Sequence, residues 1–104
     1  MEVQDNSYDI FTQAKKLYTY HKAARQLQSV VKKDAKLEYA LVWLKNEIEE
    51  CKKQIRLLGG KVAEGIDVWG ASGPIAKYQN EVVIDYEVGS LSADEFISTY
   101  RNKF

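Results

Sequence analysis

The feature that most constrains the fold is an apolar repeat between Leu37 and Leu58. Its members are spaced alternately by four and three residues, as in the buried stripe of a helix that packs along its whole length. They are Leu37, Leu41, Leu44, Ile48, Cys51, Ile55 and Leu58. An upstream stretch has the same spacing, with two polar members: Ile10, Ala14, Leu17, His21, Ala24, Gln28 and Val31. The two stripes predict a pair of helices at about 7–33 and 35–58.

The phase of the repeat changes between Val31 and Leu37, and this change predicts a turn. On one continuous helix, a step of six residues would rotate the apolar stripe by about 100°. We therefore expect a turn near 32–36, with Asp34 capping the second helix of an antiparallel hairpin. The alternative is a single helix of about 50 residues, because no glycine or proline marks the turn.

Residues 59–74 predict a long connection after this hairpin. They contain five of the six glycines and the only proline. The same stretch carries Val62, Ile66, Val68 and Trp69, which are too apolar for a free linker. We therefore expect part of this glycine-rich connection to dock onto the helices.

Residues 75–88 fit two patterns. A helical spacing joins Ile75, Tyr78, Val82 and Tyr86, whereas a strand alternation joins Val82, Ile84, Tyr86 and Val88. The helix is favoured because Pro74 suits a helix start and Gly89 a helix end. A last helix begins after Ser92, with Glu95 completing a capping box.

The preferred fold is therefore a single all-α domain over 1–104, in which two shorter C-terminal helices follow the hairpin. The alternative is an α+β fold, with a small β-hairpin at about 62–69 and 81–88 and a C-terminal helix. A chain of 104 residues with 45% hydrophobic content is long enough to bury one core.

The compartment is predicted from the lone cysteine and the N-terminal residues. Cys51 cannot form an intramolecular disulfide, and its place on the apolar stripe favours a buried thiol over a nucleophile. The N-terminus lacks the pattern of a signal peptide, and no apolar run is long enough to span a bilayer. We expect a cytoplasmic protein without a membrane partner.

No set of residues in the sequence is typical of catalysis. The chain has no metal-ligand spacing, phosphate-binding loop or serine-histidine-aspartate set in a suggestive context. In the expected hairpin His21 faces Ile48 as Gln28 faces Leu41, and a lone histidine at such a position is usually structural. We expect neither an enzyme nor a cofactor.

Two functions remain. The favoured one is a protein-interaction module, such as an adaptor, inhibitor or assembly factor of the kind common in bacteria and phages. The apolar stripes and seven tyrosines favour such a module, with self-association as a dimer among its partners. Its partner site is predicted on the glycine-rich connection around Trp69 together with the acidic C-terminal half, at Ile66, Val68, Trp69 and Tyr78. The alternative is that Trp69 folds inward and covers the end of the hairpin.

The second function is a nucleic-acid-binding accessory protein. Residues 15–36 contain seven basic residues and one acidic residue, whereas the chain as a whole has no net charge. The basic face of the first helix would contact phosphates through Lys15, Lys16, Lys22, Arg25, Lys32 and Lys33. The neutral total charge and the absence of nucleic-acid-binding motifs make this function the less favoured one.

Overall fold

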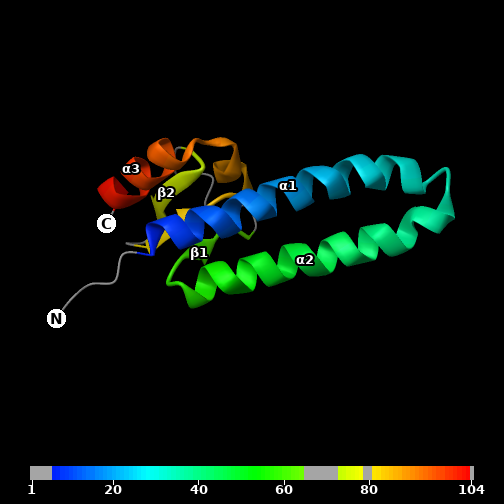
Figure 1. Cartoon of the computed structure of the whole chain (residues 1–104), viewed down its shortest axis with the longest axis horizontal. Coiled ribbons are helices and arrows are strands. Elements are labelled where there is room, and N and C mark those ends of the chain that lie inside the picture. The colour runs from blue at the N-terminus through cyan, green and yellow to red at the C-terminus, as the bar shows by residue number, and fades with distance from the viewer. Residues whose placement is uncertain (1–5, 65–72, 79–80, 104) are drawn as a thin grey trace.

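The two apolar stripes form an antiparallel helical hairpin, which runs along the length of the molecule (Figure 1). The computed structural model describes residues 6–64, 73–78 and 81–103. Helix α1 spans Ser7–Val31, the 3-10 helix η1 spans Ala35–Leu37, and helix α2 spans Glu38–Leu57. The Asp34 carboxylate accepts a hydrogen bond from the Lys36 backbone N–H at 3.0 Å, and so caps η1. The predicted hairpin is confirmed, and the single continuous helix is wrong.

The hairpin core follows the predicted stripes with one exception. Most stripe members are buried between the helices: Ile10, Ala14, Leu17, Ala24, Leu41, Ile48, Cys51 and Ile55. The placement of Gln28 against Leu41 is wrong, because the Gln28 side chain is exposed. Leu27 packs against the core from the neighbouring position, since burying a leucine is favourable whereas burying an amide needs a hydrogen-bond partner.

A small mixed sheet follows the hairpin, so the protein is mostly helical but not all-α. Strand β1 spans Lys61–Val62, β2 spans Ile75–Tyr78 and β3 spans Glu81–Ile84, in the order β1-β3-β2. Strand β3 pairs antiparallel with β2, where Ile75 faces Ile84, and parallel with β1, where Val62 faces Ile84. The predicted all-α fold therefore matches only in part, and the α+β alternative also fits the described residues.

The helix predicted over 75–88 is wrong. Val82, Val83 and Ile84 are all buried in the central strand, where β-branched side chains pack well and pairing on both edges satisfies the backbone. The alternative β-hairpin is correct in placing a strand at 81–84 and in pairing residue 62 with it, but residues 86–88 belong to a 3-10 helix and 65–69 lie outside the described residues. It is wrong in direction, because the 61–62 pairing is parallel and the antiparallel partner of β3 is β2.

Two short elements complete the chain. The 3-10 helix η2 spans Tyr86–Ser90, and helix α3 spans Ala93–Lys103. The predicted cap at Ser92 is confirmed, since the Glu95 backbone N–H donates to the Ser92 hydroxyl at 3.2 Å. The Glu95 carboxylate accepts from that hydroxyl at 3.0 Å, whereas in a complete capping box it would accept from the Ser92 backbone N–H. Helix α3 buries Phe96, whose ring lies 5.3 Å from that of Phe11 on α1.

Gly89 lies where η2 crosses α1, and it does not end a helix as the sequence suggested. A Cβ atom at this position would lie 2.4 Å from the Tyr18 Cβ and 2.7 Å from the Ala14 carbonyl oxygen. These distances are far below van der Waals contact, so only a glycine allows this approach.

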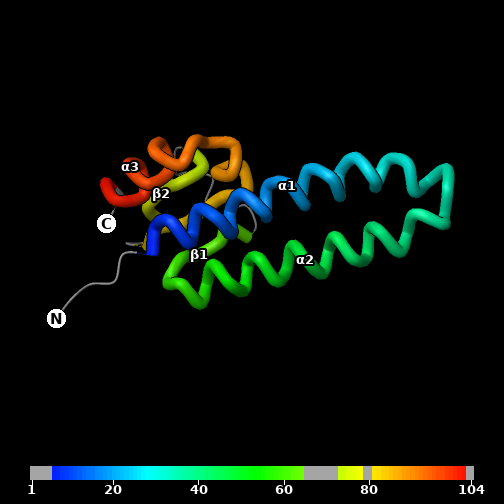
Figure 2. The backbone as a smooth tube through the Cα atoms, viewed as in Figure 1, coloured from blue at the N-terminus to red at the C-terminus, as the bar shows by residue number. Residues whose placement is uncertain are grey.

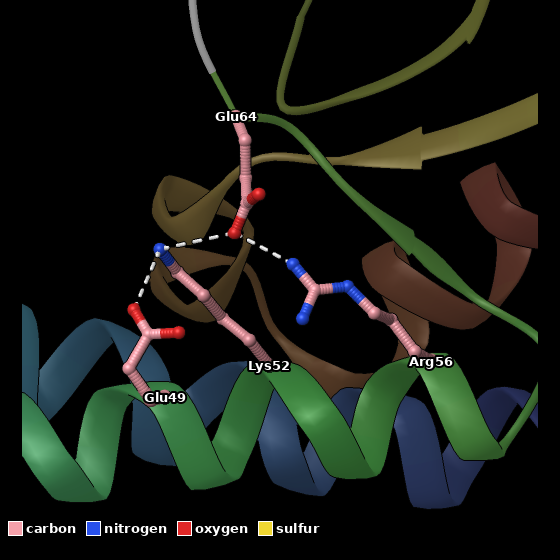
Figure 3. A network of polar contacts seen from close by, with 4 residues as sticks. All are labelled: Glu49, Lys52, Arg56 and Glu64. Atoms are coloured by element: carbon pink, nitrogen blue, oxygen red, sulfur yellow. Dashed lines mark hydrogen bonds and ion pairs between the residues drawn. The ribbon is translucent and has the colours of Figure 1, made fainter.

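Polar contacts fix the segment after β1 to α2 (Figure 3). The Glu64 carboxylate lies 2.6 Å from the Arg56 guanidinium and 3.7 Å from the Lys52 ammonium, which also pairs with Glu49 at 3.6 Å. On β3, Glu81 pairs with Lys61 of β1. The sheet is therefore joined to the hairpin on the side of α2 that carries Lys52.

The molecule has a compact end and a projecting arm. The sheet, η2 and α3 gather at one end of the hairpin, while the end with the turn extends away from them (Figures 1 and 2). The described chain measures 52 × 28 × 22 Å along its principal axes. We call residues 20–48 the arm; its base contacts the compact end through His21 and Arg25.

Candidate protein interface

Large apolar side chains are exposed on the arm. Tyr39 is 87% exposed, Trp43 54%, Val42 52% and Val30 45%. Single exposed apolar residues are ordinary on a protein surface, but here four lie on one projecting hairpin. The arm is therefore the candidate binding surface of the described residues.

Helical geometry places part of this apolar surface on one side of the arm. On α1, Tyr20, Ala23, Leu27 and Val30 are spaced by three, four and three residues and so share one side. The Tyr20 ring packs edge-on against the Trp43 ring of α2, with centroids 5.8 Å apart. We call the surface formed by this row and by the neighbouring α2 residues the arm face: Tyr20, Ala23, Leu27, Val30, Ala40 and Trp43.

The compact end packs on the other side of the hairpin. Lys52, which forms an ion pair with Glu64, is nine residues from Trp43. This spacing places the two side chains about 180° apart around the axis of α2. Tyr18, which meets η2 at Gly89, is two residues and so about 200° from Tyr20 on α1. Within the described part of the chain, the arm face is therefore turned away from the sheet and η2.

A second cluster lies where the base of the arm meets η2. The His21 imidazole stacks on the Tyr86 ring at 3.9 Å, and the Arg25 guanidinium donates a hydrogen bond to the Tyr86 hydroxyl at 2.9 Å. The His21 Nδ1 is buried and has no hydrogen-bond partner among the described residues. Burial lowers the pKa of His21, as do the positive charges of Arg25 and Lys52, while Asp85 opposes this shift. The neutral imidazole is thus favoured in the fold.

A shallow depression beside this cluster is lined by Tyr18, Lys22, Arg25, Gln26, Tyr86 and Glu87. Among the described residues, no group of histidine, cysteine and carboxylate side chains is arranged to hold a metal ion. Cys51 is buried as the sequence predicted, and burial raises the pKa of its thiol, which disfavours the nucleophilic thiolate.

Of the partner-binding residues predicted from the sequence, the structure describes only Tyr78, which is not on the arm. Ile66, Val68 and Trp69 lie outside the described residues, so the structure does not place them. Tyr78 ends β2 at the compact end, where its side chain is half-buried. The described part of the predicted site and the arm face therefore lie in different parts of the molecule.

The predicted basic residues are all exposed, but they do not form one face. Lys15 and Lys16 line one surface depression together with Tyr20, while Lys22 and Arg25 line the depression beside Tyr86. The remaining two basic residues, 32 and 33, lie at the tip of the arm. The positive charge is therefore distributed around and along α1.

Comparison with protein-family models, with curated proteins and with solved structures gives no match. Within the described ranges, no helix is both long enough and apolar enough to cross a membrane.

Sequence reasoning missed Tyr39, Val42 and Trp43 as candidate interface residues. A signal for them was present, because they belong to an apolar run from Tyr39 to Leu44 of which only Leu41 and Leu44 lie on the predicted stripe. A helix cannot bury a run of six consecutive residues on one side. The remaining members of such a run must therefore face another part of the chain, a partner or water.

Proposed function

We propose that this protein is a non-enzymatic protein-interaction module that binds a protein partner through the arm face. The observation that carries the proposal is the state of Trp43, which is 54% exposed on a projecting hairpin although tryptophan has a large apolar area to bury. Truncation of interface tryptophan and tyrosine residues often causes the largest losses in affinity. Trp43 and its neighbour Tyr20 provide such a pair.

The packing of the arm supports this role, because its helices and the Trp43 ring are held in place before a partner binds. Helices α1 and α2 pack against each other through a buried stripe, and the Tyr20 ring holds the Trp43 ring in an edge-on contact. A partner that binds here immobilises few additional side chains, so less of the binding free energy is lost to ordering. Adaptor, inhibitor and assembly-factor roles are all compatible with this arrangement.

Site-specific photo-crosslinking tests the proposal. A benzophenone amino acid replaces Ala40, an exposed member of the arm face one turn from Trp43 on α2, in the full chain, and the labelled protein is irradiated in extracts of the source cells. Lys77, which is exposed on β2 of the compact end, is the matched control position. We expect a discrete protein adduct from position 40 and none from position 77; the absence of any protein adduct at position 40, or equal adducts at both positions, contradicts the proposal.

A second candidate function is nucleic-acid binding, which the exposure of all six predicted basic residues favours. Its contacts would be to phosphates, so retention on immobilised DNA or RNA must fall steeply as the salt concentration rises. A double variant of the tip, Lys32→Glu with Lys33→Glu, is expected to weaken this retention and reduce its salt dependence. Retention that is absent at low salt, or that does not change with salt, contradicts this second function.

A further inference from the structure

We propose that the depression between α1 and η2 binds a small organic phosphate monoester. The depression has a volume of about 330 Å³, which is at the lower end of the range of about 300–1,000 Å³ for small-ligand sites. It lies on the side of α1 that faces η2. A ligand bound here would therefore leave the arm face free for a protein partner.

The α1 wall of the depression supplies three nitrogen donors. Arg25 and Gln26 follow Lys22 by three and four residues, so the three side chains project from one side of the helix. All three line the same depression. A phosphate monoester has three acceptor oxygens and nearly two negative charges at neutral pH, so it can accept from all three side chains and pair with both cations. A carboxylate has one charge and two oxygens in a single plane, so it matches this set of donors less well.

The η2 wall holds the guanidinium in place. Arg25 donates a hydrogen bond to the Tyr86 hydroxyl at 2.9 Å, and the Tyr86 ring is itself fixed by stacking on His21. A guanidinium has five N–H donors, so others of Arg25 remain for a ligand. Gly89 also packs directly on α1 at Tyr18, which keeps the two walls together. The site is therefore formed before a ligand binds, which reduces the cost of binding.

The positive charges of Lys22 and Arg25 are not neutralised within the described part of the chain. Neither side chain forms an ion pair there, whereas other basic side chains such as Lys52 do. Glu87 lines the depression as well, with its carboxylate 3.5 Å from the Tyr86 hydroxyl. Two cations and one carboxylate leave an excess of positive charge, which favours an anionic ligand.

The two tyrosine rings of the depression define the organic part of the ligand. Tyr18 and Tyr86 both line it, and the Lys22 ammonium lies 6.0 Å from the centre of the Tyr18 ring. A group that binds at this ammonium is therefore close to an aromatic surface. Aromatic side chains bind other rings in offset or edge-on contacts, so we expect the phosphate to carry an aromatic or similarly flat group.

An NMR titration of the full ¹⁵N-labelled chain with phenyl phosphate tests this site. We expect saturable shifts of the amide signals around the depression, in 18–26 and 86–87, with a dissociation constant of about 1 mM or below. Phenol lacks the phosphate and inorganic phosphate lacks the ring, so each is expected to bind at least about tenfold more weakly. Shifts that do not saturate, or an equal affinity for either of these two probes, overturn the inference.

Lys22→Gln tests the contribution of the lysine, because Lys22 is exposed and its replacement breaks no ion pair of the described fold. The dissociation constant for phenyl phosphate is expected to rise at least about tenfold. Lys15→Gln is the matched control, since Lys15 is exposed on the same helix but lines a different depression. Circular dichroism verifies that both variants keep their helices, and an equal loss of affinity in the two variants overturns the inference.

His21 provides a second readout because it is the only histidine of the chain. Burial and the positive charges of Arg25 and Lys52 lower its pKa, against the effect of Asp85. A bound dianion offsets those positive charges, so the pKa of His21 is expected to rise when phenyl phosphate saturates the site. An unchanged His21 pKa at saturation overturns the inference. A single-stranded oligonucleotide that causes the same amide shifts at a lower concentration than phenyl phosphate also overturns it, in favour of nucleic-acid binding.

Discussion

The contact of Gly89 with α1 allows a sharp test of how the compact end is attached to the hairpin. In Gly89→Ala the new Cβ would lie 2.4 Å from the Tyr18 Cβ, 2.7 Å from the Ala14 carbonyl oxygen and 3.0 Å from the Lys15 Cα. Carbon atoms in contact are separated by about 3.5–4.0 Å, so η2 must move by roughly 1 Å or more. All three neighbouring atoms belong to the backbone of α1 or are fixed to it directly, so a rotamer change cannot relieve the clash.

The expected cost follows from what this displacement disturbs. Movement of η2 opens the packing of the fully buried Val88 and the stacking of Tyr86 on His21. Overpacking of this kind costs about 1–3 kcal/mol, and the lower entropy of the unfolded alanine variant returns about 0.4–1 kcal/mol. We therefore expect a net loss of about 1–2 kcal/mol in the free energy of unfolding.

Urea unfolding followed by circular dichroism measures this loss. For a domain of this size with an m-value of about 1–1.5 kcal/mol/M, the midpoint is expected to fall by about 0.7–2 M. Ser98→Ala, at an exposed position on α3, is the control and is expected to change stability by less than about 0.5 kcal/mol. A Gly89→Ala midpoint equal to that of the wild type would refute the close approach of η2 to α1.

Three further predictions follow from the described core. Ile48→Ala should lower the free energy of unfolding by about 2–4 kcal/mol because it leaves a cavity between the helices, whereas the exposed Glu49→Ala should change it by under about 0.5 kcal/mol; equal urea midpoints for the two variants would contradict the stripe. The pKa of His21 is lowered in the fold, so the unfolded state binds more protons and stability should fall as the pH drops below about 6.5; urea midpoints at pH 7.5 and 5.5 should show a smaller drop in His21→Phe, and an unchanged drop would contradict this. The buried Cys51 thiol, with its raised pKa, should react with a thiol reagent at pH 7.5 only as fast as the protein opens; rapid reaction of the folded protein would show that the thiol is accessible.

The hairpin was predictable from the sequence because its signal is local. The alternation of four and three residues from Leu37 to Leu58 depends on the period of one helix, and the phase change after Val31 requires a turn. The helix cap at Ser92 is likewise contained within four residues. Each of these features needs no knowledge of what the rest of the chain does.

The sheet was not predictable in the same way because its stabilising contacts are distant in sequence. Val62 pairs with Ile84 across about 20 residues, and this third strand is what makes β2 and β3 more than an isolated hairpin. From residues 75–88 alone, helical and strand spacings fit equally well. The contact of Gly89 with α1 is also non-local, so a helix end was the nearest local explanation for that glycine.

The sequence pattern led to a different candidate interface for a related reason. Glycines on either side of Trp69 suggested a presented ring, whereas Trp43 lay within the most strongly periodic helix and was not considered as a binding residue. Only the fold shows that the compact end packs on the opposite side of the hairpin and that Trp43 stays half-exposed. The signal available in the sequence was the apolar run from Tyr39 to Leu44, which is wider than the stripe that the helix buries.

The central claim, that this protein binds a protein partner through the arm face, is tested most directly by the affinity of Trp43→Ala for the partner that the cross-link at position 40 identifies. We expect the dissociation constant to rise at least about 30-fold, while circular dichroism shows that the helices are retained. An unchanged dissociation constant in a folded Trp43→Ala variant would contradict the account.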